Sequence, residues 1–197
     1  MTVEGGDRER AIIDATLERM NEKGTLDWTG YSFSWFSCLA ARAGRADEAL
    51  RYLVDYERAF ILRNGFHVNG DQVGAGLSNF RYRPFTLEGN FLAMEAVHDM
   101  LLQSWGGRVR VFPAVSEKWA NVSFADLRAE GGFRVSAQRQ AGRTAQVAIT
   151  ATVAGPLRLK NPFGADQFQA SLPCDTAEGE IRCALAAGQT VTFCTVD

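Results

Sequence analysis

The sequence has only two histidines, five prolines and four cysteines among 197 residues, and it lacks any long apolar run. Without about 20 consecutive apolar residues it cannot form a membrane-spanning helix, and no lysine-rich amphipathic segment suits a membrane surface. The 21 basic and 23 acidic residues leave a net charge of −2 without a basic stripe. We therefore expect neither a membrane nor nucleic acid as a partner. The polar, acidic start does not resemble a signal peptide. This alone does not distinguish a cytoplasmic from an exported protein, so both locations stay open.

The cysteines are Cys38, Cys174, Cys183 and Cys194, and no two of them form a Cys-x-x-Cys pair. With no histidine cluster beside them, a zinc site is not expected. The favoured interpretation is free thiols packed as small apolar side chains. A disulfide among the last three is the alternative, and it requires an oxidising compartment. The sequence also lacks the phosphate-binding loop of a dinucleotide site and a serine-centred nucleophile elbow. It suggests no obligatory metal or organic cofactor.

The chain changes character near residue 106. Apolar residues at helical spacing predict helices over residues 7–23, about 29–43, 46–62 and about 89–104, with Asp7 as the first cap and a polar loop over 64–83. After Trp105-Gly106-Gly107 the apolar residues alternate with a period of two, which predicts strands. The fold class is therefore α+β, with a helical domain over 1–106 and an antiparallel β domain over 107–197.

The expected inward-facing strand residues describe a small antiparallel sandwich. They are Val109, Val111, Phe133, Val135, Ala137, Ala145, Val147, Ile149, Ala151, Val153, Ile181, Cys183, Leu185, Val191 and Phe193. In the helical part, the second helix is apolar over a wide arc that includes Trp35. We expect Trp35 to pack, and such a helix needs neighbours on several sides. Either further helices are missing from the chain, or a small bundle packs on the sheet.

Three stretches carry a resemblance to a known family. They are residues 28–32 (Trp-Thr-Gly-Tyr-Ser), 84–91 (Pro-Phe-Thr-Leu-Glu-Gly-Asn-Phe) continuing to Met-Leu-Leu-Gln-Ser at 100–104, and Phe-Pro-Ala at 112–114 with Leu-Arg-Ala-Glu-Gly-Gly-Phe at 127–133. In this order and spacing they resemble glycoside hydrolase family 95, the inverting alpha-L-fucosidases. The resemblance implies the last helices of an (α/α)6 barrel, followed by the β domain. It also implies hydrolysis of terminal L-fucose or L-galactose linkages with inversion.

The resemblance places Glu88 where the family has the aspartate that acts as general base. The glutamate carboxylate lies one methylene further out, and a displacement of about 1 Å can cost roughly 100-fold in rate. A carboxylate just before a helix is favoured by the helix dipole, and Gly89 permits an unusual backbone angle or a close approach of substrate. The alternative is a glutamate that only caps the helix. Asn90, from the same motif, is expected to contact the sugar.

A second group of expected sugar contacts lies in the polar loop. His67, Asn69 and Asp71 alternate, so an extended segment would project their polar groups the same way, toward sugar hydroxyls. The alternative is a surface turn shaped by asparagine and glycine. Tyr82 and Arg83 fall in Arg-Tyr-Arg-Pro at 81–84, where the family has Ala-His-Pro-Pro. These changes would touch the sugar pocket, so the resemblance does not fix fucose specificity.

Aromatic residues and the second histidine have two interpretations each. Trp28 and Tyr31 can stack on a pyranose ring or pack in the helical core. His98 is expected to be structural or to pair with Glu95 rather than to act in catalysis.

The resemblance also indicates what the chain lacks. An inverting glycosidase needs two carboxyl groups roughly 6.5–9.5 Å apart, and the family's general acid lies in a more N-terminal barrel helix. We therefore expect a fragment of an inverting exo-glycosidase that is inactive alone, with carbohydrate and the missing N-terminal part of the barrel as partners. The alternatives are a non-catalytic carbohydrate-binding module and a structural protein without a sugar site.

Overall fold

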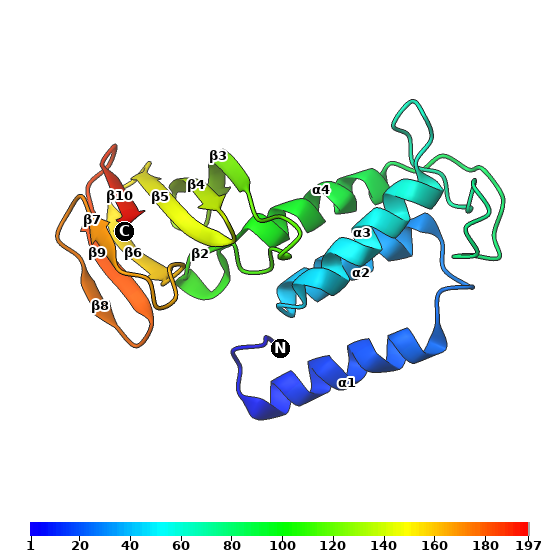
Figure 1. Ribbon diagram of the computed structural model, residues 1–197, viewed down its shortest axis with the longest axis horizontal. Helices are drawn as coiled ribbons and strands as arrows, with labels where there is room; N and C mark the ends of the chain where they lie inside the picture. The colour runs from blue at the N-terminus through cyan, green and yellow to red at the C-terminus, as the bar shows by residue number, and fades with distance from the viewer. Residues whose placement is uncertain (197) are drawn as a thin grey trace. The chain divides into compact units, whose positions relative to one another are not determined.

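The computed structural model describes residues 1–196, which divide into two compact units, Met1–Met100 and a second unit that begins at Leu101. The first contains helices and a long loop, and the second contains mostly antiparallel strands (Figure 1). The predicted α+β class is confirmed. Across the part of the chain that is described, no helix has both the length and the apolar character to cross a bilayer.

The four predicted helices form close to their expected positions. They are α1 (Asp7–Lys23), α2 (Gly30–Arg42), α3 (Ala46–Phe60) and α4 (Glu88–Leu101). Gly6 occupies the cap position of α1 and Asp7 is its first helical residue, so the predicted cap was wrong. The carboxylate of Asp7 still lies in the first turn, where its negative charge interacts favourably with the helix dipole.

An aromatic cluster forms the core of the helical unit. The ring of Trp28 stacks on Phe36 at 4.3 Å and meets Phe33 edge-on at 5.4 Å. Such ring pairs stabilise a core beyond the area they bury. Trp35, by contrast, is 44% exposed, so the prediction that it packs was wrong for this unit.

Ion pairs connect helices within the same unit. Arg45 Nη2 lies 2.8 Å from Asp14 Oδ1, which joins α1 to the start of α3. Arg42 bonds Asp99 Oδ2 at 2.6 Å and Glu95 Oε1 at 2.9 Å, which joins α2 to α4. Glu95 therefore has an arginine partner from another helix, where the sequence had suggested His98.

The β unit has one small and two larger antiparallel sheets. β1 (Leu102–Gln103) pairs with β2 (Arg110–Val111), and η1 (Trp105–Gly107) lies between them. The five-stranded sheet has the order β3-β4-β5-β10-β7, with β3 (Val122–Ala129), β4 (Phe133–Gln140), β5 (Arg143–Ala151), β10 (Thr190–Thr195) and β7 (Phe168–Ala170). The three-stranded sheet has the order β6-β9-β8, with β6 (Gly155–Lys160), β9 (Glu180–Leu185) and β8 (Asp175–Ala177).

Both larger sheets contribute to one apolar core. Ile149 and Phe193 come from the five-stranded sheet, Leu157 and Ile181 come from the three-stranded sheet, and all four are fully buried. Burying such side chains supplies roughly 1.5–3 kcal/mol each. The predicted alternation is confirmed along β4, β9 and β10 and at the buried positions of β5, but Val153, beyond the end of β5, is 56% exposed.

Arg110 departs from the predicted alternation because it is buried beside Val111. Its guanidinium lies 3.5 Å from the ring centroid of Trp105 and donates to the Trp105 carbonyl oxygen at 2.8 Å. The ring face and the carbonyl replace the water that a buried guanidinium loses. A charged residue can therefore occupy an inward position here.

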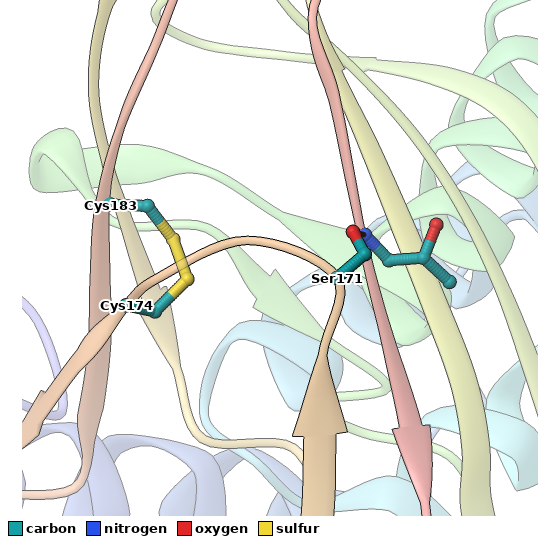
Figure 2. The surroundings of a disulfide bond; sticks show 4 residues. Ser171, Cys174 and Cys183 are labelled. Carbon is teal, nitrogen blue, oxygen red and sulfur yellow. Dashed lines mark hydrogen bonds between the residues drawn. A yellow bond between two sulfur atoms is a disulfide. The ribbon is translucent and has the colours of Figure 1, made fainter.

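Cys174 and Cys183 form a disulfide (Figure 2). Cys174 directly precedes β8 and Cys183 lies in β9, so the bond ties a short edge strand to its neighbour. The favoured interpretation of free thiols was therefore wrong for this pair. Cys38 is buried, as expected, whereas Cys194 is exposed. Ser171, also labelled in Figure 2, accepts a hydrogen bond from the Thr192 amide at 2.9 Å and so ties the end of β7 to β10.

Candidate functional site

Glu88 is the first residue of α4, and its side chain is exposed. The first turn of a helix has backbone N–H groups without helical partners, which favours an ionised carboxylate there. The segment before Glu88 is held by the loop that follows α3. Val68 forms an antiparallel bridge with Phe85, and the Asn69 amide donates to the Pro84 carbonyl at 3.3 Å. Glu88 thus extends from an anchored turn.

His67 is fully buried beneath this turn. Its Nδ1 lies 2.9 Å from the Thr86 carbonyl oxygen and 2.8 Å from Thr86 Oγ1. Its backbone amide donates to Asn90 Oδ1 at 3.0 Å, and Asn90 Nδ2 donates to the Gly65 carbonyl at 2.9 Å. The residues two before and two after Glu88 are therefore both bonded to His67.

Two glycines make room for the imidazole. A Cβ built on Gly89 would lie 2.5 Å from His67 Nδ1, and one built on Gly30 would overlap His67 Nε2. Real Cβ atoms do not approach other atoms so closely, which explains glycine at the first turns of both α4 and α2. The close approach that the sequence suggested at Gly89 is therefore made by the imidazole of His67.

The environment of His67 favours the neutral ring. Burial lowers the pKa of His67, and the Thr86 hydrogen bond and the charge of Glu88 only partly oppose that effect. Nε2 is buried and has no hydrogen-bond partner within residues 1–196. A proton on Nε2 would therefore be an unsatisfied buried donor. We assign the proton to Nδ1, where it bonds the Thr86 carbonyl.

Asp71 organises the loop between α3 and α4. Its buried carboxylate accepts hydrogen bonds from the backbone amides of residues 73–76 at 2.8–3.2 Å. Burial would raise the pKa of Asp71, but the amides of Ala75, Val73 and Gly74 lower it below its usual range. These contacts occupy both carboxylate oxygens, so the side chain acts as a bracket for the loop.

The other expected sugar contacts divide between the core and the surface. Trp28 is 8% exposed and belongs to the aromatic cluster, which favours its packing interpretation. Tyr82 and Arg83 are exposed, and Arg83 Nε lies 2.5 Å from Gln72 Oε1. Asn69 is half-buried and its Oδ1 lies 3.4 Å from Thr86 Oγ1. Through Thr86 the structure links His67 and Asn69 to the turn of Glu88.

Large apolar side chains are exposed on both sides of Glu88 in the sequence. Leu87 is 45% exposed and Phe91 is 60% exposed, and Met94, one turn further along α4, is 69% exposed. Phe66 and Phe85 are half-exposed and contact each other at 4.6 Å between ring centroids. Such concentrations of exposed apolar residues mark surfaces that bind another molecule or segment.

The sequence did not reveal how His67 and Asp71 would be used. The signal for Asp71 was the following Val-Gly-Ala-Gly, since an aspartate before such a segment often accepts bonds from its amides. The signal for His67 lay in Gly30 and Gly89, which are distant in sequence. Within the described residues, no group of three or more histidine, cysteine or acidic side chains is placed to hold a metal ion.

The β unit contains a different polar cluster beside a shallow groove. The groove, of about 480 Å³, is lined in part by Asp175, Arg158 and Arg182. Both guanidiniums bond the buried carboxylate of Glu180 at 3.0 Å, and Arg108 Nε lies 2.5 Å from it. Burial opposes ionisation, but these arginines lower the pKa of Glu180. With Asp175 beside them, the charges largely compensate one another, as in a structural ion-pair network.

Comparison with known proteins supports the predicted family resemblance. Residues 103–196 match the model of the glycoside hydrolase family 95, C-terminal domain. Over 151 residues the chain is 28% identical to Alpha-L-fucosidase 2 of Arabidopsis thaliana, and the match covers 76% of this chain but 17% of that protein. The chain thus spans about a sixth of the length of this curated relative.

Two solved structures of glycoside hydrolases show a weaker likeness. One is a family 39 glycoside hydrolase from Bacteroides cellulosilyticus WH2, at 12% identity and a TM-score of 0.31, covering 80% of this chain and 30% of that one. The other is a GH127 beta-L-arabinofuranosidase from Geobacillus stearothermophilus T6, at 12% identity and a TM-score of 0.31, covering 81% and 31%. Neither likeness is strong enough to bear on the fold.

Proposed function

We propose, from the premise that this chain is a C-terminal segment like those of glycoside hydrolase family 95, that it supplies the base-bearing turn of an inverting exo-glycosidase. The substrates would end in L-fucose or L-galactose-like sugars. In this proposal α1 to α4 are the last helices of an (α/α)6 barrel, and the β unit is the sandwich that follows it. The observation that carries the proposal is an exposed carboxylate, Glu88, on a turn anchored from both sides by His67.

Glu88 would take a proton from a water molecule as that water attacks the anomeric carbon. A helix start is a favourable place for a carboxylate, and the carboxylate is the form that a general base requires. A carboxylic acid on the opposite side of the sugar would protonate the leaving oxygen, roughly 6.5–9.5 Å away. That acid would come from helices outside this chain, so we expect the isolated chain to be inactive.

The remaining expected residues take two kinds of role. Asn69, Tyr82 and Arg83 are at least partly accessible and would contact sugar hydroxyls. The carboxamide oxygen of Asn90 accepts a hydrogen bond from the His67 amide, and its nitrogen donates to the Gly65 carbonyl. Any sugar contact would use what remains accessible of the side chain. Trp28 and Asp71 support the unit from its interior.

The exposed apolar side chains support the idea of a larger chamber. Leu87, Phe91 and Met94 would be covered by further helices of the barrel, because apolar area of this kind gains roughly 25 cal/mol per Å² when it is buried. Contact with further helices would likewise explain why Trp35 is exposed on α2.

A second candidate is a non-catalytic carbohydrate-binding module of the same ancestry. The specific observation in its favour is Glu88 itself, since the family's base is the shorter aspartate. A displaced carboxylate can still accept hydrogen bonds from sugar hydroxyls.

The test is to incubate the intact chain with aryl L-fucosides and L-galactosides, and to titrate it with the free sugars while recording amide NMR spectra. We expect no turnover and shifts centred on residues 86–90, with L-rhamnose and D-glucose as sugar controls. Robust turnover by the chain alone would overturn the proposal that it is incomplete. Absence of any sugar-dependent shift in that turn would overturn the sugar site.

A further inference from the structure

We infer that His67 is a positioning residue that fixes the turn carrying Glu88 without touching the sugar. The inference rests on the proposed function of Glu88. It differs from the sequence-based expectation that the imidazole itself contacts substrate, because the ring is fully buried beneath the turn. A general base must lie within hydrogen-bond reach of its water, so whatever fixes the turn also sets the rate.

His67 holds the turn at two points that flank Glu88. On the N-terminal side, Nδ1 lies 2.9 Å from the Thr86 carbonyl oxygen, two residues before Glu88. On the C-terminal side, the His67 amide donates to Asn90 Oδ1 at 3.0 Å, two residues after Glu88. With both neighbouring residues bonded to one residue, the backbone of Glu88 has little freedom to rotate or slide.

The ring itself is held between two helix starts. Gly30 of α2 lies against Nε2 and Gly89 of α4 lies against Nδ1, and neither position has room for a methyl group. The Tyr56 ring packs at 5.3 Å between centroids. A side chain confined in this way transmits its position to whatever it bonds, which is how supporting residues orient a catalytic group.

The hydrogen-bond chemistry selects one tautomer. With the proton on Nδ1, the ring donates to the Thr86 carbonyl and leaves only a lone pair at Nε2, beside Gly30. With the proton on Nε2, Nδ1 could accept from the Thr86 hydroxyl at 2.8 Å, but its lone pair would face the Thr86 carbonyl oxygen at 2.9 Å and a buried donor would be unsatisfied. These contacts favour the neutral Nδ1–H ring.

Two substitutions separate positioning from packing. In H67N, the shorter amide can place an N–H near the position of Nδ1 and keep the bond to Thr86. In H67F, a ring of similar size fills the space between the glycines but donates no bond. H98F is the matched control, because His98 is the other histidine and lies in the second half of α4.

The readouts follow the turn, the ring and the sugar separately. Long-range ¹H–¹⁵N spectra of the intact chain should show the Nδ1–H tautomer of His67. In H67F we expect shifted amide signals at Thr86, Gly89 and Asn90, and a sugar affinity that falls about fivefold to tenfold. H67N should restore most of each property, and H98F should leave all of them as in the natural sequence.

Each outcome decides between the two ideas. An Nε2–H tautomer, or an H67F chain with unchanged turn signals, would overturn the positioning role and leave the proposed function standing. A shifted turn in H67F, when the natural chain binds no sugar, would support the positioning role and overturn the proposed function. If H67F does not fold, G89A is the second variant. Its added methyl group would crowd the imidazole of His67 at Nδ1, so it should move the Thr86 and imidazole signals. Unchanged signals in G89A would also overturn the inference.

Discussion

Gly89 lies directly against the imidazole of His67, and a methyl group on Gly89 would stand 2.5 Å from Nδ1. This relationship predicts that G89A destabilises the chain, although alanine is favoured over glycine within helices by about 1 kcal/mol. Overpacking of a confined side chain typically costs about 1–3 kcal/mol, so after this gain we expect a net loss of up to about 2 kcal/mol. Urea denaturation of G89A and the natural chain measures the difference.

The control for this substitution is G155A. A Cβ on Gly155 meets nothing within 4 Å. We therefore expect G155A to change the free energy of unfolding little. An increase in stability for G89A, as helix propensity alone would give, would show that His67 does not confine this position.

The buried carboxylate of Asp71 predicts a second stability effect. D71A would leave the amides of residues 73–76 without their acceptor, and we expect a loss of about 2–3 kcal/mol, mostly from unsatisfied donors. D71N keeps an acceptor but removes the charge, so its loss should be smaller. The exposed Asp27 supplies the control D27A. Equal stabilities of D71A and D27A in urea would contradict the role of Asp71.

The pH dependence of the same group has a definite sign. Because the folded-state pKa of Asp71 lies below its unfolded value of about 3.9, the folded state binds protons less readily. Its stabilising contribution is complete above the unfolded pKa and is lost as the pH falls through the folded pKa. D71N should lose stability less steeply than the natural chain in that acidic range.

These features show where sequence reasoning succeeds and where it stops. The helical and strand regions were predictable because periodic apolar residues report which face is buried, as for Val135 and Ile149. The position of Glu88 at a helix start was predictable for the same reason. The burial of His67 was not, because it depends on glycines 37 residues before and 22 residues after it in the sequence. The burial of Arg110 was missed because a ring face and two carbonyls, rather than an apolar neighbour, receive it.

His67 predicts a pH effect in a higher range. Burial lowers its folded-state pKa below the unfolded value of about 6.5, so protons bind the unfolded chain more readily. Its contribution to stability is complete above about pH 6.5 and declines as the pH falls toward the folded pKa, by up to about 1.4 kcal/mol per pH unit. Stability measured between pH 7.5 and about 5 should show this slope, and H67N should flatten it. A slope that persists in H67N would assign the effect to other groups.

The disulfide predicts a redox effect confined to the β unit. Cys174 and Cys183 are nine residues apart, and closing such a short loop restricts the unfolded chain enough to contribute about 2–3 kcal/mol. The bond also holds β8, whose three residues are all exposed and pair only with β9 among the described strands. We expect reductant, or the double substitution of Cys174 and Cys183 by serine, to lower the free energy of unfolding by that amount.

Amide hydrogen exchange locates the effect of the disulfide. After reduction, exchange should quicken first over residues 175–177, while the buried strands β5 and β10 keep their protection until global unfolding. C194S is the control, because the exposed Cys194 lies outside the bond. If reductant left both the stability and the exchange over β8 unchanged, the pair would not be bonded in solution.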